Sequence, residues 1–251
     1  MKKKIKVVAI ITARLNSSRL RSKHILKANK KYMISHLIER LKSIKSINEI
    51  VLATTTNKID DKFKSIANKH QIKLYRGSEE NVKLRVLEAA KKFSAKVICN
   101  VTGDCPIIDP ILIDQLINTF LKNEKSDLCY YGCFKNYGLP NGMDSCVYTY
   151  SALKKSYNMT KKKDEFEHVT LNMLRNKKIF KSIFLYPPKN TNFSNLSLTL
   201  DYFEDYLVIK KIINRFKNLK KFPSCLQIID FVNKKKLYKL NSKLKRLVLN
   251  N

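Results

Sequence analysis

Residues 5–23 have the sequence IKVVAIITARLNSSRLRSK, and the order of elements that begins here repeats along the chain. Ile5 to Thr12 is a continuous run rich in β-branched side chains, which is typical of a strand buried on both faces of a parallel sheet. A basic loop follows from Ala13 to Lys23. Residues 32–44 then carry apolar side chains at the spacing of an amphipathic helix. Strand, loop and helix in this order predict the first half of a βαβ unit.

Strands and helices continue to alternate as far as about residue 125, and the pattern is less regular beyond it. The predicted strands cover residues 49–55, 72–75, 96–102, 145–149 and 197–201. The predicted helices cover residues 59–70, 80–93, 111–121 (with Pro110 at its start), 151–158, 164–176 and 203–217. We therefore expect an α/β fold, a Rossmann-like, doubly wound and mostly parallel sheet with a mixed α+β C-terminal extension. Because no linker is evident, residues 1–251 are predicted to form a single domain, with a core over about 5–217 and a helical, basic tail over about 218–251.

Composition places the chain among ordinary globular proteins, with 251 residues, 44% of them hydrophobic and 28% charged. No run approaches the roughly 20 apolar residues that span a bilayer, so we expect no membrane helix. The basic start and the short apolar run after it resemble a signal peptide, but Arg14 and Arg19 follow where a cleavage site is expected. The six cysteines contain no C-x-x-C pair, which favours reduced thiols. These features predict a cytoplasmic protein.

The formal charge of +31 makes nucleic acid an alternative partner, because a basic surface attracts phosphate chains whatever its fold. Only nine of the 51 basic residues are arginine, and the lysines are spread through predicted helices, loops and tail. Such lysines are mostly solvated surface. The sequence also has no helix-turn-helix, zinc-finger or ribonucleoprotein signature. We therefore expect that nucleic acid is not the main partner.

The basic loop is the first candidate site, since ligands of open parallel sheets bind beyond the carboxyl ends of the strands. Arg14, Arg19 and Lys23 supply cations for phosphate oxygens, and Ser17 and Ser18 supply hydroxyl groups. The loop is neither a Walker A sequence nor G-x-G-x-x-G, which disfavours a P-loop ATPase or a dinucleotide enzyme.

Two aspartates also follow predicted strands. Asp104 comes after Thr102 and Gly103, and Asp201 comes after Leu200. Two carboxylates at one sheet edge suit Mg²⁺, which binds through one or two carboxylates together with substrate phosphates. Each aspartate could instead form a turn or cap a helix.

Several motifs together resemble a known family. The pattern A-R-x-x-S-x-R-L-x-x-K of the basic loop is similar to the N-terminal loop of the cytidylyltransferases that make CMP-sugars. This group contains the acylneuraminate and 3-deoxy-manno-octulosonate cytidylyltransferases, and the chain most resembles the subgroup named for spore coat polysaccharide biosynthesis. Further matching segments follow in family order, at residues 76–85, 102–110, 142–144, 167–170 and 198–205.

The resemblance implies a fold of the nucleotide-diphospho-sugar transferase type and assigns roles to residues. The implied catalytic residues are Lys23, Arg14 and Asp104. The implied nucleotide-binding residues are Ala13, Arg14, Ser17, Ser18, Arg19, Lys23, Arg76, Gly77, Ser78, Arg85, Thr102 and Gly103. Asp104 and Asp201 match the pair that binds Mg²⁺, and the residues expected towards the sugar are Asn141, Asp144, Glu167 and His168. The implied reaction is transfer of CMP from CTP to a sugar, with release of pyrophosphate, by a homodimer.

The chain departs from the family pattern at seven positions, which are Asn16, Arg21, Ser22, Leu84, Cys146, Tyr202 and Phe203. The first three alter the shape of the basic loop and leave its cations in place. Leu84 and Cys146 concern base and sugar preference, and the Tyr202-Phe203 pair after Asp201 is compatible with the start of a helix. Three other functions stay open. They are a nucleotidyltransferase that uses UTP or GTP, a non-catalytic nucleic-acid-binding module, and a glycosyltransferase, although residues 103–105 lack the D-x-D motif typical of that class.

Overall fold

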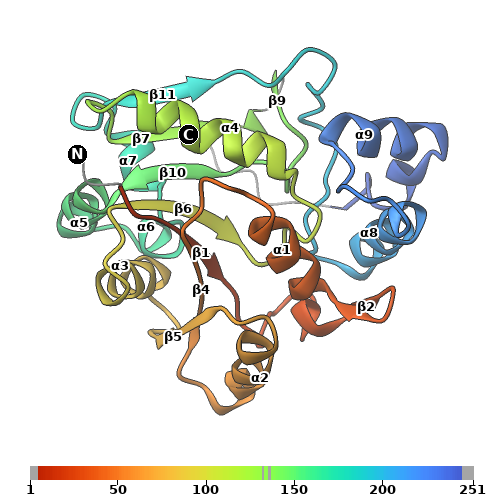
Figure 1. Cartoon of the computed structure of the whole chain (residues 1–251), viewed down its shortest axis with the longest axis horizontal. Helices are drawn as coiled ribbons and strands as arrows, with labels where there is room; N and C mark the ends of the chain where they lie inside the picture. The colour runs from red at the N-terminus through yellow and green to blue at the C-terminus, as the bar shows by residue number, and fades with distance from the viewer. Residues whose placement is uncertain (1–4, 132, 135–136, 245–251) are drawn as a thin grey trace.

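A seven-stranded sheet forms the centre of the computed structural model, which describes residues 5–131, 133–134 and 137–244 (Figure 1). Its strands are β1 (Val7–Thr12), β4 (Glu49–Thr55), β5 (Lys73–Gly77), β6 (Val97–Thr102), β7 (Leu128–Tyr131), β10 (Cys146–Thr149) and β11 (Ser182–Leu185). Their order across the sheet is β11-β7-β10-β6-β1-β4-β5. Only β10 runs antiparallel to its neighbours, β6 and β7. The predicted mostly parallel sheet is therefore confirmed.

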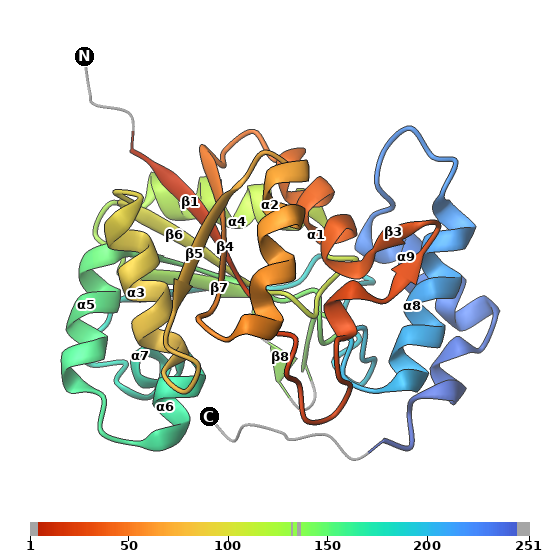
Figure 2. The same ribbon diagram turned by 90° about the horizontal axis from the view of Figure 1, so that it is seen from below.

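Helices cover both faces of this sheet (Figure 2). One face carries α1 (Met33–Lys42), α2 (Lys62–Lys69) and α4 (Pro110–Lys122), while α8 (Phe203–Phe216) and α9 (Cys225–Lys234) lie to one side of the sheet and share the same hydrophobic core. The other face carries α3 (Val82–Lys92), α5 (Tyr150–Met159), α6 (Lys163–Glu167) and α7 (Leu171–Arg175). The short elements are η1 (Lys23–Ile25), β2 (Lys27–Ala28), β3 (Lys31–Tyr32), η2 (Lys58–Asp61), β8 (Cys133–Phe134), β9 (Tyr137–Gly138) and η3 (Leu237–Leu240). Within the described ranges, no helix is long and apolar enough to cross a membrane.

Local sequence explains the central strands and the helix starts. Val7 to Ile11 of β1 are all buried, and their side chains alternate between the two cores. Asp109 caps α4 by accepting a hydrogen bond from the Ile111 amide at 2.9 Å, and Pro110 occupies the first helical position. Asn81 caps α3 in the same way, through the amide of Leu84. The helix boundaries are thus encoded within a few residues.

The direction of winding changes between β1 and β6. From β1 the chain adds β4 and then β5 on one side, and it returns to add β6 on the other side. Thr12 and Thr102, the last residues of β1 and β6, are partners in the parallel register. The loops that follow these two strands therefore begin side by side, at the point where open α/β sheets bind ligands.

The structure corrects the sequence prediction beyond residue 125. Residues 197–201 form no strand, because this segment makes only an isolated bridge between Ser197 and Asn141. The helix predicted over 164–176 is two short helices, α6 and α7, since His168 adopts an extended conformation between them. The C-terminal strands β7, β10 and β11 join the main sheet, so the extension beyond it consists of α8, α9 and η3. Residues 245–251 of the predicted basic tail lie outside the described residues.

A fully buried lysine links helices on one face of the sheet. The Lys83 ammonium of α3 donates hydrogen bonds to Ser156 Oγ at 3.0 Å and to Thr160 Oγ1 at 2.7 Å. Ser156 in turn donates to Asn172, which donates to Glu165 at 2.8 Å. Burial lowers the pKa of Lys83 to about 8, although the charge of Glu165 opposes the shift.

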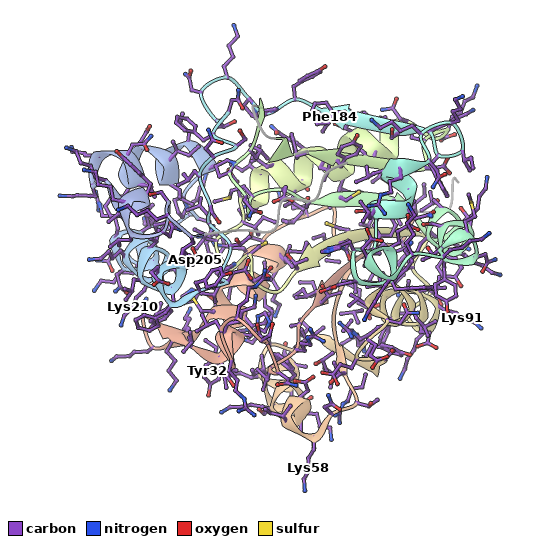
Figure 3. All side chains as sticks on the ribbon, turned by 180° about the vertical axis from the view of Figure 1, so that it is seen from behind. Tyr32, Lys58, Lys91, Phe184, Asp205 and Lys210 are labelled. Carbon is purple, nitrogen blue, oxygen red and sulfur yellow. The ribbon has the colours of Figure 1, made fainter. Side chains whose placement is uncertain are left out.

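Lys83 is expected to make stability rise with pH. Between pH 8 and about 10.5, its ordinary pKa, the unfolded chain holds a proton that the folded chain has released. The contribution of Lys83 to the free energy of unfolding should therefore increase over this interval, by about 3 kcal/mol at most. Between pH 7.5 and pH 10, the change in the free energy of unfolding measured with urea should be less positive for Lys83→Met than for the native chain. Lys91→Met, on the exposed side of α3 (Figure 3), is the matched control. Equal changes in the two variants would contradict the assignment.

Candidate active site

The basic loop is anchored to the neighbouring strand. Its Leu15 amide donates a hydrogen bond to Asp60 Oδ1 at 2.8 Å, and the Leu15 side chain is buried. The other carboxylate oxygen of Asp60 accepts hydrogen bonds from Thr54 and Thr55 at the end of β4. The loop closes on itself when the Ser22 amide donates to the Leu15 carbonyl at 2.9 Å. These bonds fix both ends of the loop beside the end of the sheet.

Lys23 lies between two of the predicted site residues, Asp104 and Asp201. Its ammonium lies 3.0 Å from Asp104 Oδ2 and 2.9 Å from Asp201 Oδ1, and only 5% of the residue is exposed. Arg19 Nη2 is a second partner of Asp201 Oδ1, at 2.8 Å. The loop after β1, the loop after β6 and the segment before α8 therefore meet at one point, as the sequence predicts.

The charges at this point stabilise one another. Burial alone would lower the pKa of Lys23, but the charges of Asp104 and Asp201 outweigh it and raise the pKa. Burial alone would raise the pKa of Asp104, but the charge of Lys23 and a hydrogen bond from Thr102 bring it down to about 2. Lys23 and Asp104 are thus both ionised at neutral pH.

Gly103 allows the loops after β1 and β6 to approach closely. A Cβ atom at this position would lie 2.9 Å from the Ala13 Cβ and 3.0 Å from His24 Cε1. The Gly103 amide donates to the Thr12 carbonyl at 2.9 Å, and the Gly103 carbonyl lies 3.1 Å from His24 Nδ1. Burial, followed by the charge of Lys23, lowers the pKa of His24 to about 4, so its ring is neutral. The neutral ring of His24 therefore packs against Gly103 at the start of the loop after β6.

Backbone hydrogen bonds hold the segment that carries Asp201 against the loop after β6 and against Asn141. The Leu200 amide donates to the Asp104 carbonyl at 2.8 Å, which holds the two aspartates at adjacent positions. Asn141 is paired to the same segment, since its carbonyl accepts from the Leu198 amide at 2.7 Å. Gly142 has a φ of +96°, and a Cβ atom there would lie 2.8 Å from the Leu198 backbone.

Asp144 is one of the residues predicted to lie towards the sugar. Its Oδ1 accepts the Gly142 amide at 3.0 Å. Burial raises the pKa of Asp144, and the nearby charge of Asp104 adds to this shift, although two backbone hydrogen bonds oppose it. Asp144 therefore lies close enough to Asp104 for their charges to interact. Glu167 is exposed at the end of α6 and His168 is half-buried after it, with its amide donating to the Asp164 carbonyl. No contact in the described ranges joins Glu167 or His168 to Asp104.

Two arginines, Arg76 and Arg85, bond to the backbone of the segments that are predicted to line the base and ribose side of the nucleotide pocket. Arg76 donates to the Thr55 and Asn57 carbonyls and to Asp61, so its guanidinium fixes the connection after β4. Arg85 is buried and donates to the Ser78 carbonyl. Its buried Nε has no hydrogen-bond partner among the described residues.

The remaining predicted nucleotide residues lie close to these arginines or in the basic loop. Gly77 is buried, and a Cβ atom there would lie 3.2 Å from Arg85 Cγ. Ser78 Oγ accepts the Asn81 amide at 3.1 Å. Arg14 is partly exposed and lies 3.8 Å from Glu79. In the basic loop and after β6, Ser17 is partly exposed while Ser18 and Thr102 are exposed.

The donor set suits Mg²⁺. The carboxylates of Asp104 and Asp201 come from different segments and face a common point. The Lys23 ammonium lies at this point, so a cation can be held there. No group of three or more potential metal-ligating side chains occurs in the part of the chain that the structure describes. Zinc sites usually need three or four protein ligands, whereas Mg²⁺ binds through one or two carboxylates and substrate phosphates.

Comparison with known proteins agrees with this geometry. The family model described as cytidylyltransferase matches residues 8–251. The chain belongs to the cytidylyltransferase family. The solved structure of a cytidylyltransferase from Leptospira borgpetersenii is similar, with a TM-score of 0.88 and 30% identity, covering 96% of this chain and 100% of that one.

Two further relatives confirm the predicted resemblance. The spore coat polysaccharide biosynthesis protein SpsF of Bacillus subtilis is 28% identical over 214 residues, which are 83% of this chain and 87% of SpsF. A 3-deoxy-manno-octulosonate cytidylyltransferase of Geotalea daltonii is 31% identical over 114 residues, which are 45% of this chain and 44% of that enzyme. This cytidylyltransferase is therefore an enzyme of the nucleotidyltransferase class.

Three supporting residues of the cytidylyltransferase lay outside the predicted site. Asp60 holds the basic loop, as described above. Asp205 lies at the start of α8 (Figure 3) and accepts the amides of Asp201 and Tyr202 through Oδ2. Asn241 donates to Asp205 Oδ1 at 2.7 Å and to the Ser197 carbonyl at 3.0 Å. The sequence carries a partial signal only for Asp205, an acidic residue four positions after Asp201.

Proposed function

We propose that this cytidylyltransferase transfers CMP from CTP to a hydroxyl group of a sugar, with Mg²⁺ and with release of pyrophosphate. The convergence of Lys23, Asp104 and Asp201 at one point is the observation that supports it. The similarity to SpsF and to a 3-deoxy-manno-octulosonate cytidylyltransferase favours a sugar for surface polysaccharide, and the second favours an acidic sugar. We also propose a cytoplasmic homodimer.

The chemistry follows from charge and position. A sugar hydroxyl group loses its proton to solvent as its oxygen forms a bond to the α-phosphorus of CTP, and the bond from that phosphorus to the bridging oxygen of the β-phosphate breaks, so that pyrophosphate leaves. Lys23, Arg14 and Arg19 offset the negative charge of the phosphates. Asp104 and Asp201 would hold Mg²⁺, which neutralises charge on the phosphate oxygens when bound. No covalent intermediate with the enzyme is required, so the protein acts through positioning and electrostatics.

A substrate screen tests the proposal. Purified protein with Mg²⁺ is incubated with each of CTP, UTP, GTP and ATP against a panel of acidic and neutral sugars, and pyrophosphate is measured. The expected result is release with CTP and at least one acidic sugar, and mass spectrometry should identify the CMP-sugar. Release with UTP or GTP alone would reassign the nucleotide. The absence of release with every sugar, combined with salt-sensitive binding of RNA or DNA, would favour a nucleic-acid-binding module.

A further inference from the structure

The Lys23 ammonium occupies the position between the two carboxylates of the proposed metal site. It is almost completely buried and is the shared partner of Asp104 and Asp201. Asp201 also pairs with Arg19, whose side chain is 39% exposed. The protein therefore neutralises its own carboxylates, and a divalent cation and an ammonium cannot share this position because their charges repel.

We infer that Lys23 keeps free divalent cations away from Asp104 and Asp201, and that these carboxylates bind a metal only when phosphate groups draw the Lys23 ammonium away from them. The inference rests on the proposed function insofar as a nucleoside triphosphate is the substrate. Metal alone would have to displace Lys23 and leave an ammonium without a buried partner, which is unfavourable. A metal–nucleoside triphosphate complex avoids this cost, since its phosphates offer Lys23 new anions while its metal offers the aspartates a new cation.

Local structure permits the exchange without movement of the sheet. Lys23 begins the three-residue helix η1, and Ser22 before it has a left-handed φ of 57°. The lysine side chain has four rotatable methylene groups, so its ammonium can move while its backbone stays in place. The aspartates are fixed independently, because the Leu200 amide and the Asp104 carbonyl are hydrogen-bonded and Asp205 holds the Asp201 amide. The carboxylates are thus prepared for a cation that Lys23 excludes.

Binding of Mn²⁺ in the absence of nucleotide tests the inference. Free Mn²⁺ is measured by electron paramagnetic resonance during titration of the native protein, Lys23→Met and Arg21→Met. Arg21 is exposed in the same loop, so its substitution removes one positive charge without opening the carboxylates. We expect Lys23→Met to bind one Mn²⁺ per chain at least about tenfold more tightly than the native protein or Arg21→Met. Addition of Asp104→Asn to Lys23→Met should abolish this gain.

Stability measurements show whether the variant is folded. Mn²⁺ should raise the melting temperature of Lys23→Met and leave that of the native protein almost unchanged. If Lys23→Met does not fold, Lys23→Gln replaces it, since its amide can still donate to one carboxylate.

The inference is overturned if the native protein without nucleotide binds Mn²⁺ as tightly as Lys23→Met does. It is also overturned if the folded Lys23→Met variant binds Mn²⁺ no more tightly than the native protein. These titrations contain neither nucleotide nor sugar. An error in the proposed substrates would therefore leave them unchanged and would be detected by the pyrophosphate screen instead.

Discussion

Replacement of Asp104 or Asp201 by asparagine is expected to lower turnover by about 1000-fold while the protein stays folded. Each change removes one negative charge from the point where the proposed Mg²⁺ binds, and asparagine has the same shape as aspartate. The backbone hydrogen bond between Leu200 and Asp104 does not depend on either side chain, so the two segments should stay together. The measurement is pyrophosphate release at saturating CTP, Mg²⁺ and sugar.

Asp230→Asn is the matched control for both variants. Asp230 is exposed on α9, so loss of its charge should leave turnover at the native level. Far-ultraviolet circular dichroism and thermal melting should show that all three variants are folded. Turnover above about a tenth of the native value in Asp104→Asn or Asp201→Asn would exclude that residue as a metal ligand.

Lys23→Met is expected to give the second largest loss, a fall in kcat/KM of about 100-fold. The variant loses the buried cation that is proposed to offset the charge of the phosphates. It also leaves Asp104 without its ion pair and Asp201 with Arg19 alone, which should reduce the free energy of unfolding by roughly 3 kcal/mol. Initial rates at varied CTP and urea unfolding at neutral pH measure the two effects. Arg21→Met should show neither, and native kcat/KM in Lys23→Met would remove the lysine from the site.

The sequence predicts the first half of the fold well because the information there is local. Buried runs of β-branched residues specify β1, β4 and β6, and a cap such as Asn81 or Asp109 marks where a helix begins. The position of the site also follows from local order, since each candidate loop comes directly after a strand. Lys23, Asp104 and Asp201 could therefore be grouped before any contact between them was known.

The second half depends on contacts between distant residues, which periodicity does not record. Residues 197–201 have the alternation of a strand. Their backbone amides instead donate hydrogen bonds to the carbonyls of Asn141 and Asp104, outside the main sheet. Asn241 resembles any polar residue of a basic tail, and only the fold shows it bonded to Asp205. Asp60 likewise supports the basic loop from 45 positions away.

The pairing of Lys23 with Asp201 also has a consequence for biosynthesis. The two residues are 178 positions apart, and the ribosome makes the basic loop long before the second aspartate. A nascent chain with its first strands folded would present Lys23 to Asp104 alone. Asn241, which steadies Asp205 beside Asp201, is made later still. On the proposed function, capacity for catalysis is therefore the last property that the growing polypeptide acquires, and chains released before residue 201 are expected to be inactive.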